Sequence, residues 1–114
     1  MGYYTDYELT VSYYRTGNQN IPKDISDRLA DRIEEIEWFE AGGSPEDGYY
    51  VNAKWYSNKE DMCKLSSEFP TVLFCLSGEG ESSGDLWKAY FLNGKFQYCP
   101  AQITYDDFDL DKLM

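Results

Sequence analysis

The feature that most constrains the fold is the dipeptide Asn93-Gly94, which lies between two β-prone segments. Asn-Gly in that setting predicts a two-residue type I′ turn, because both central residues must adopt positive φ. The turn pairs Phe91 with Phe96 and fixes the register of a hairpin over residues 86–99. The residues then expected on one face are Trp87, Ala89, Phe91, Phe96 and Tyr98, and those on the other are Lys88, Tyr90, Lys95 and Gln97. This separation of apolar from polar side chains supports the register.

The rest of the chain carries two strand patterns and two helix patterns. Alternation predicts half-buried strands at 7–14 and 49–56, and a short apolar run predicts a central strand at 72–76. A helix is expected from about Pro22 to Phe39, with Asn20 as its cap. Its apolar stripe consists of Ile25, Leu29, Ile33 and Ile36. A second helix opens on the capping-box sequence Ser57-Asn58-Lys59-Glu60, buries Met62, Leu65 and Phe69, and ends at Pro70.

These elements predict an α+β fold in one domain covering residues 1–114. We expect a four-stranded, mainly antiparallel sheet with two helices packed on one face, in the order β-α-β-α-β-β. Residues from about 100 to 114 form an acidic, aromatic tail that either docks loosely or stays mobile.

The charge of the chain excludes several classes of function. There are 10 Lys and Arg against 21 Asp and Glu, which gives a formal net charge of -11. Phosphate contacts need a basic surface, so direct binding to nucleic acid or to an anionic membrane is not expected. The sequence contains no apolar run of transmembrane length and no signal-peptide pattern. The three cysteines, Cys63, Cys75 and Cys99, are widely spaced, which favours reduced thiols and a cytoplasmic location.

No catalytic residue, cofactor or metal site is predicted. The chain has no histidine, which removes the commonest general base and the commonest zinc ligand. The glycine-rich segment 77–85 lacks the glycine spacing and the Lys-Ser/Thr of a phosphate loop, and it lacks the pattern of a calcium loop. The carboxylates are scattered, so none stands out as an acid–base pair. We therefore expect a protein that is not an enzyme.

A row of carboxylates on the first helix is the first candidate for binding a partner. Asp27, Asp31, Glu34 and Trp38 recur at helical spacing on the face opposite the apolar stripe. Carboxylates spaced in this way lie about 5–6 Å apart and resemble a line of phosphates. The indole of Trp38 at the end of the row can anchor an interface. The alternative is an ordinary solvated helix face. Glu79, Glu81 and Asp85 in the glycine-rich segment complete the predicted contact surface.

The tyrosines offer a different candidate surface. The strand patterns place Tyr14, Tyr50, Tyr56 and Tyr90 opposite the helices, together with Lys54 and Lys88. Tyrosine supplies rigid, amphipathic contact area, so an open face of this kind indicates recognition. Tyrosine is also simply well suited to half-buried strands, and both interpretations stay open.

The second half of the chain and its first residues resemble a group of small bacterial and phage proteins of uncharacterised function. The likeness is carried by Met1-Gly2-Tyr3-Tyr4-Thr5 and, most specifically, by a segment of the type GEGExSGDLWKxYFxNGK at residues 78–95. The resemblance implies an origin in bacteria or in phage-infected cells, and it transfers no active site.

Together, the acidic charge and this resemblance favour a non-enzymatic, phage-derived inhibitor. It would bind a basic surface of a bacterial defence protein that handles nucleic acid, such as a CRISPR effector or a nuclease, in the manner of an anti-CRISPR protein. The alternative is an immunity-type or housekeeping module of a bacterium that recognises a protein or a small ligand through the tyrosine-rich sheet face.

Overall fold

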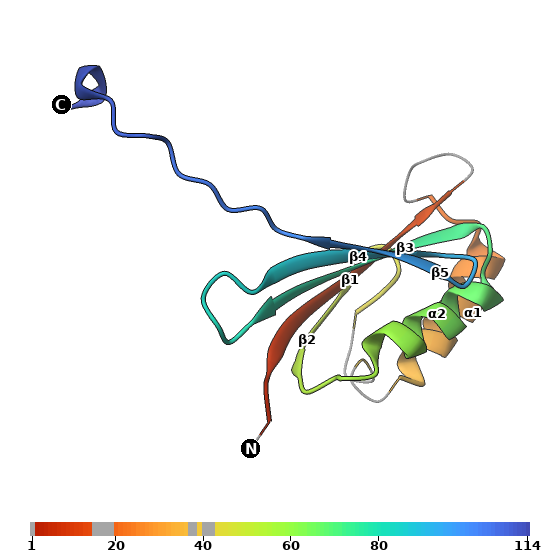
Figure 1. Cartoon of the computed structure of the whole chain (residues 1–114). Helices are drawn as coiled ribbons and strands as arrows, with labels where there is room; N and C mark the ends of the chain where they lie inside the picture. Colours follow the sequence, from red (N-terminus) through yellow and green to blue (C-terminus); the bar gives the residue numbers. More distant parts are fainter. Residues whose placement is uncertain (1, 15–19, 37–38, 40–42) are drawn as a thin grey trace.

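The computed structural model describes residues 2–14, 20–36, 39 and 43–114. It is an α+β structure in which one antiparallel sheet is covered on one face by two helices (Figure 1). The elements in chain order are β1 (Thr5–Tyr13), α1 (Lys23–Glu34), β2 (Tyr49–Ala53), α2 (Asn58–Glu68), β3 (Val72–Gly80), β4 (Leu86–Leu92), β5 (Lys95–Pro100) and a short 3-10 helix (Leu110–Lys112).

The predicted strand count was wrong. The sheet has five strands in the spatial order β2-β1-β3-β4-β5, and every neighbouring pair is antiparallel. The predicted order allowed only two strands after the second helix, whereas the structure has three. These three are β3, which continues to Gly80, and the two strands of the hairpin, β4 and β5. The prediction that β3 is a central strand is confirmed.

The hairpin follows the predicted register. Phe91 pairs with Phe96 and Ala89 with Tyr98. Asn93 and Gly94 have φ of 49° and 81°, as a type I′ turn requires. The hairpin is specified by its own sequence, because a tight turn and an alternating pattern act over a few residues.

The first helix ends earlier than predicted, at Glu34 instead of Phe39. After Glu34 the backbone hydrogen bonds join residues three apart, as in a 3-10 turn. The N–H of Ile36, for example, donates to the carbonyl of Ile33 at 3.0 Å. Phe39 is thereby buried in the core. Pro22, and not Asn20, precedes the helix as its N-cap.

The second helix begins at Asn58, but the predicted capping box is not formed. The side chain of Ser57 makes no capping bond to the helix backbone, and its hydroxyl donates instead to Asp61 Oδ2 at 2.8 Å. The helix ends at Glu68, just before Phe69 and Pro70, as predicted.

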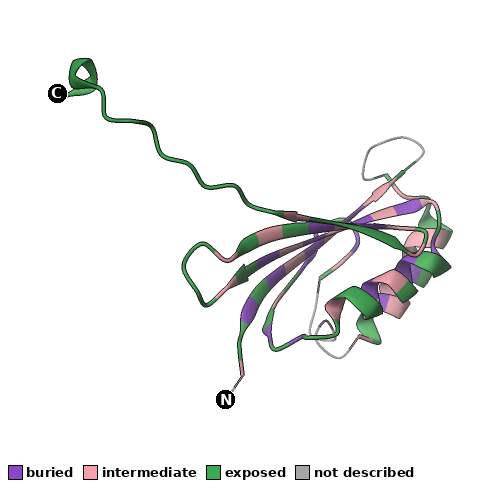
Figure 2. Cartoon of the chain, viewed as in Figure 1, coloured by how far each residue is buried: buried purple, intermediate pink, exposed green. Residues whose placement is uncertain are grey.

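The core lies between the helices and one face of the sheet. Burial alternates along β1 and β3, so each strand turns one side to the helices and the other away from them (Figure 2). The helices contribute Leu29, Ile33, Met62 and Leu65 to this core. The opposite face of the sheet, here called the open face, is not covered by either helix, and it carries the alternate residues of every strand.

Candidate functional site

The acidic row of α1 is exposed to solvent along the helix. Asp27, Asp31 and Glu34 are all exposed, while Leu29 and Ile33 are buried on the other side. Asp27 is already engaged, since Lys23 Nζ lies 3.0 Å from its Oδ2. Trp38, the predicted anchor, lies outside the described residues. The described part of the row is thus a solvated helix face with two carboxylates available to a partner.

The acidic loop between β3 and β4 holds the N-terminal segment in place. The hydroxyl of Tyr3 donates to Asp85 Oδ2 at 2.6 Å and accepts from the backbone N–H of Ser82 at 2.8 Å. The N–H of Tyr4 donates to the carboxylate of Glu81. Two of the three predicted contact carboxylates therefore bind the protein's own chain, and this part of the loop has a structural role.

The two halves of the predicted acidic surface are far apart. The loop between β3 and β4 extends from one end of the sheet, and α1 lies toward the other end (Figure 1). Sequence spacing could not reveal this separation, because it depends on the order and direction of the strands. Within the described residues, the carboxylates of α1 therefore do not lie beside those of the loop between β3 and β4.

The open face carries a row of side chains that runs across all five strands. The paired residues are Tyr50 on β2, Glu8 on β1, Ser77 on β3, Lys88 on β4 and Cys99 on β5. Neighbouring strands lie about 4.8 Å apart, so the row is continuous. A small serine stands between the glutamate and the lysine, which leaves the middle of the face hollow.

A groove with a volume of about 540 Å³ occupies this hollow. Its lining includes Asp6, Glu8 and Glu79, the lysine Lys88, and the aromatic side chains of Tyr50 and Tyr90.

The polar groups of the groove are held by short contacts with their neighbours. Asn52 Nδ2 donates to Asp6 Oδ1 at 2.7 Å. Hydrogen bonding to the Glu8 carboxylate raises the pKa of Tyr50 above its ordinary value. Among the described residues, Lys88 takes part in no ion pair. The groove thus presents acceptors and aromatic edges together with one available ammonium group.

The tyrosine-rich face matches the sequence prediction only in part. Tyr50 and Tyr90 line the groove. Tyr56 lies outside β2, and its hydroxyl accepts the N–H of Tyr3 at 2.7 Å. Lys54 also lies outside the sheet, with its ammonium 5.3 Å from the ring centre of Tyr4. The acidic side chains of β1 were not singled out from the sequence, although the alternation of β1 already put Glu8 on its polar side.

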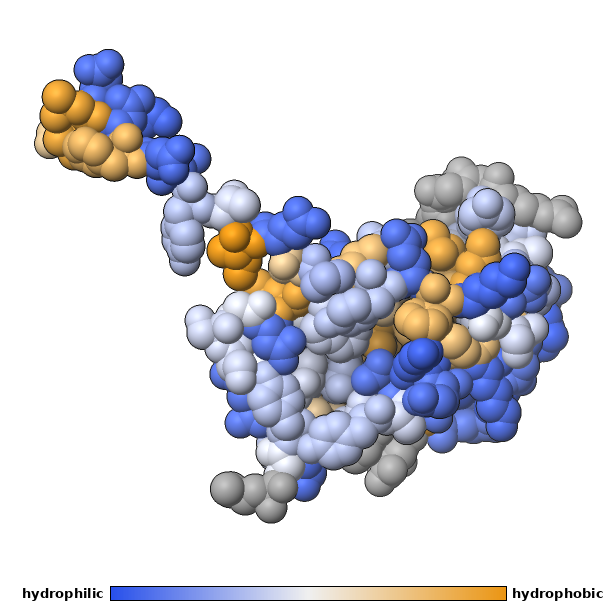
Figure 3. Space-filling view, viewed as in Figure 1, coloured by the Kyte–Doolittle hydropathy of each residue, from blue (hydrophilic) through white to orange (hydrophobic). Residues whose placement is uncertain are grey.

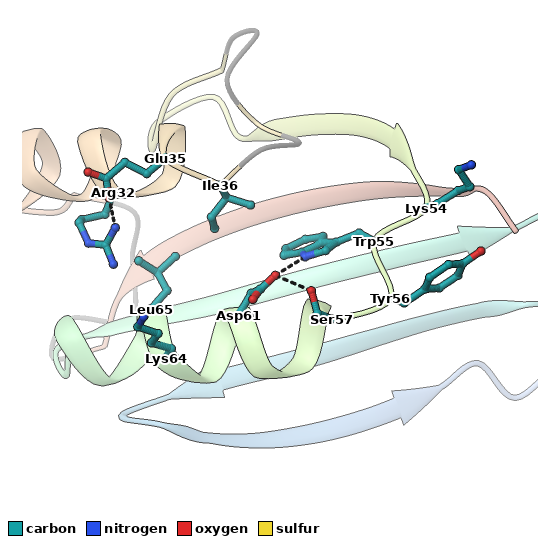
Figure 4. A pocket seen from close by; sticks show the side chains of 10 residues that line it. All are labelled: Arg32, Glu35, Ile36, Lys54, Trp55, Tyr56, Ser57, Asp61, Lys64 and Leu65. Atoms are coloured by element: carbon teal, nitrogen blue, oxygen red, sulfur yellow. Dashed lines mark hydrogen bonds and ion pairs between the residues drawn. The ribbon is translucent and has the colours of Figure 1, made fainter. Parts of the chain in front are cut away.

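A second cleft, of about 500 Å³, lies between the end of α1 and the start of α2 (Figure 4). Its central carboxylate, Asp61, accepts from Trp55 Nε1 at 2.6 Å and from the Ser57 hydroxyl at 2.8 Å. Arg32 at its rim is paired with Glu35. These polar groups bind one another and fix the first turn of α2 against the core, so this cleft is the weaker candidate for a ligand site.

Arg32 also joins the two helices through a bidentate pair with Glu68. Its Nε and Nη2 atoms lie 2.9 Å and 2.6 Å from the two carboxylate oxygens of Glu68. The hydrogen bonds from Arg32 hold the pKa of Glu68 below its usual range. Both side chains are more than a third exposed, so solvent screening limits the contribution of the pair to less than about 1 kcal/mol.

This pair predicts a small loss of stability in acid. A carboxylate with a lowered folded-state pKa contributes stability above its unfolded pKa of about 4.3, and that contribution disappears as the pH falls further. Urea unfolding at pH 6 and at pH 3 measures how much the free energy of unfolding falls in acid. This fall should be smaller in Arg32→Gln than in the wild type. Lys23→Gln, which removes an exposed pair within α1, is the matched control. Equal pH dependence in Arg32→Gln and the wild type would contradict the assignment.

The described residues contain no group of three or more histidine, cysteine or acidic side chains arranged to hold a metal ion. Cys63, Cys75 and Cys99 are free and half-buried. Cys75 lies on the open face rather than in the core. Burial raises the pKa of the Cys63 thiol, which lowers the share of thiolate at neutral pH.

Comparison with protein families, with curated proteins and with solved structures found no match for this chain. In the described part of the chain, no helix is long and apolar enough to cross a membrane.

Proposed function

We propose that this protein is a non-enzymatic binding protein that recognises a basic, extended segment of a partner protein in the groove of its open face. The observation that carries this proposal is the gathering of Asp6, Glu8 and Glu79 around Tyr50 and Tyr90 in one hollow of the sheet. Three carboxylates against one lysine favour a cationic occupant. The tyrosines favour one whose side chains pack on aromatic rings.

The chemistry of the groove fits an arginine or lysine side chain. Such a side chain, lying over Ser77, comes within reach of Glu8 while its stem packs on the ring of Tyr50. Lys88, across the serine, is placed to bind a backbone carbonyl or a carboxylate of the same segment. The existing bond of Asn52 to Asp6 lowers the cost of ordering that carboxylate when the partner binds.

A second candidate, supported by the net charge of -11, is inhibition of a bacterial protein that handles nucleic acid. The contact would then be the row on α1, where Asp31 and Glu34 are exposed. Attraction between this helix and a basic channel would be long-ranged and sensitive to salt. A phage origin, implied by the resemblance of residues 78–95, is compatible with both candidates.

Selection from a randomised peptide library separates the two surfaces. The wild type is expected to enrich extended peptides with arginine or lysine beside an aromatic or aliphatic residue. Glu8→Gln with Tyr50→Ala should weaken binding of an enriched peptide by about ten-fold or more, which corresponds to about 1.4 kcal/mol. Asp31→Lys with Glu34→Lys, the matched change on α1, should leave that affinity within about two-fold at physiological salt. The reverse pattern would favour the α1 row and contradict the groove.

A further inference from the structure

The C-terminal tail extends away from the rest of the molecule. Residues 101–114 follow Pro100 at the end of β5, and every one of them is exposed (Figure 2). Hydrophobic side chains are exposed near the start of the tail and at its far end (Figure 3). The large exposed apolar and aromatic residues of the tail are Ile103, Tyr105, Phe108, Leu110, Leu113 and Met114.

The composition of this tail predicts a docked state. Burying a large apolar side chain contributes about 1.5–3 kcal/mol, and a tail surrounded by water forgoes that contribution at several positions. Acidic residues alternate with the apolar ones, at Asp106, Asp107, Asp109 and Asp111. The segment therefore fits an apolar surface that has a basic rim.

The protein itself has such a surface beside β5. A groove of about 440 Å³ lies between the start of α2 and the helix-facing side of β4 and β5. Phe96 and Tyr98 remain 42% and 55% exposed there, because α2 does not fully cover the last strand. Lys59 stands over Phe96, with its ammonium 4.3 Å from the ring centre. Each of the two grooves has a lysine in its lining, but this one, unlike the groove of the open face, is lined by no carboxylate.

β5 is also an edge strand of the sheet. In a hairpin closed by a two-residue turn, the pair Leu92–Lys95 next to the turn is joined by two backbone hydrogen bonds. The following pairs alternate between non-hydrogen-bonded and hydrogen-bonded, and residues of the non-hydrogen-bonded pairs direct their N–H and C=O groups away from the partner strand. The N–H groups of Phe96 and Tyr98 therefore face away from β4, toward the unpaired edge. The edge stops at Pro100, which has no N–H to offer. A second extended segment can pair at this edge while its side chains enter the neighbouring groove.

We propose that the tail of one copy docks along the β5 edge and in the groove between α2 and β5 of a second copy, and that the reciprocal contact forms a dimer. Charge complementarity between the aspartates of the tail and Lys59 supports this occupant, as does the match between the apolar side chains on the two sides. The second copy is favoured over the tail's own groove because the tail leaves β5 in the direction away from α2 (Figure 1). Docking on its own groove would require the chain to reverse direction just after Pro100, whereas docking on a partner requires no reversal. The contact is isologous, since each copy supplies both a tail and a groove.

The mass of the full chain in solution tests this inference. Light scattering after size exclusion at 0.15 M salt, where the repulsion between two acidic chains is screened beyond about 8 Å, should give a dimer. Deletion of residues 102–114, or Phe108→Asp with Leu110→Asp, should give a monomer that keeps the far-UV circular dichroism of the folded wild type. Thr104→Asn, an exposed tail substitution that removes no large apolar side chain, is the matched control and should stay dimeric. A monomeric wild type, or a dimer that survives the deletion, would overturn the proposal.

A mixing experiment separates docking on a partner from docking on the same chain. Lys59→Glu with Tyr98→Glu alters the groove and leaves the tail intact, so this variant alone should be monomeric. Mixed with the deletion variant, it should form a one-tailed heterodimer, since one copy supplies a tail and the other a groove. Failure to form any heterodimer, while both variants keep the wild-type circular dichroism, would contradict the exchange of tails.

Discussion

Trp55→Ala is expected to lower the free energy of unfolding by about 3–5 kcal/mol, as large-to-small changes of buried aromatic residues do. Trp55 is 1% exposed, and its ring centre lies 5.3 Å from those of both Tyr7 and Phe39. Its Nε1 also donates to Asp61 at 2.6 Å. The substitution would open a cavity where the connection between β2 and α2 meets the core, and would leave the carboxylate without its indole partner. Urea unfolding followed by far-UV circular dichroism measures the effect.

Two further variants show which part of that loss comes from packing. Trp55→Phe keeps most of the ring and removes the bond to Asp61, so its cost should be clearly smaller than that of alanine. Tyr50→Ala removes an aromatic ring that is 67% exposed and should change the free energy of unfolding by less than about 0.5 kcal/mol. A loss below about 1 kcal/mol for Trp55→Ala would contradict the described core.

Gly78→Ala is expected to destabilise the protein by about 1–3 kcal/mol through overpacking. Gly78 lies on the helix-facing side of β3, where the indole of Trp87 lies across it. A Cβ at this position would come within 2.3 Å of ring atoms of Trp87. Either the indole or the strand must move, so near-UV circular dichroism should change along with stability.

Ser77→Ala is the matched control for this glycine, because Ser77 is the next residue along β3 and points to the open face. Its effect on stability should stay below about 0.5 kcal/mol. Equal and small effects of the two substitutions would show that Trp87 does not pack on β3 as the structure has it.

Local patterns in the sequence predicted the elements that depend on local physics. The hairpin at Asn93-Gly94 has the predicted register because the turn and its alternation act over neighbouring residues. The apolar stripe of α1 packs as expected, with Leu29 and Ile33 buried. The end of the same helix was misplaced, because the change to i+3 bonds that buries Phe39 depends on the distant partners Tyr49 and Trp55.

The candidate site could be predicted less well from the sequence than the helices and strands. Glu8, Ser77 and Lys88 come from three different strands, and only the order of those strands makes them neighbours. Conversely, nothing in the sequence indicated that Glu81 and Asp85 have partners, because Tyr4 and Tyr3 lie 77 and 82 residues away along the chain. The grouping of charges into a site is a property of topology, which residue spacing alone does not encode.

A titration followed by NMR tests whether the groove of the open face binds a basic segment. The labelled protein would be mixed at 0.15 M salt with a short peptide of alternating arginine and glycine, and the backbone amide signals followed. We expect the largest saturable shifts at Glu8, Ser77 and Lys88, whereas the signals of Asp31 and Glu34 on α1 should stay unchanged. Shifts centred on α1, or no saturable shifts on the open face, would contradict the proposal.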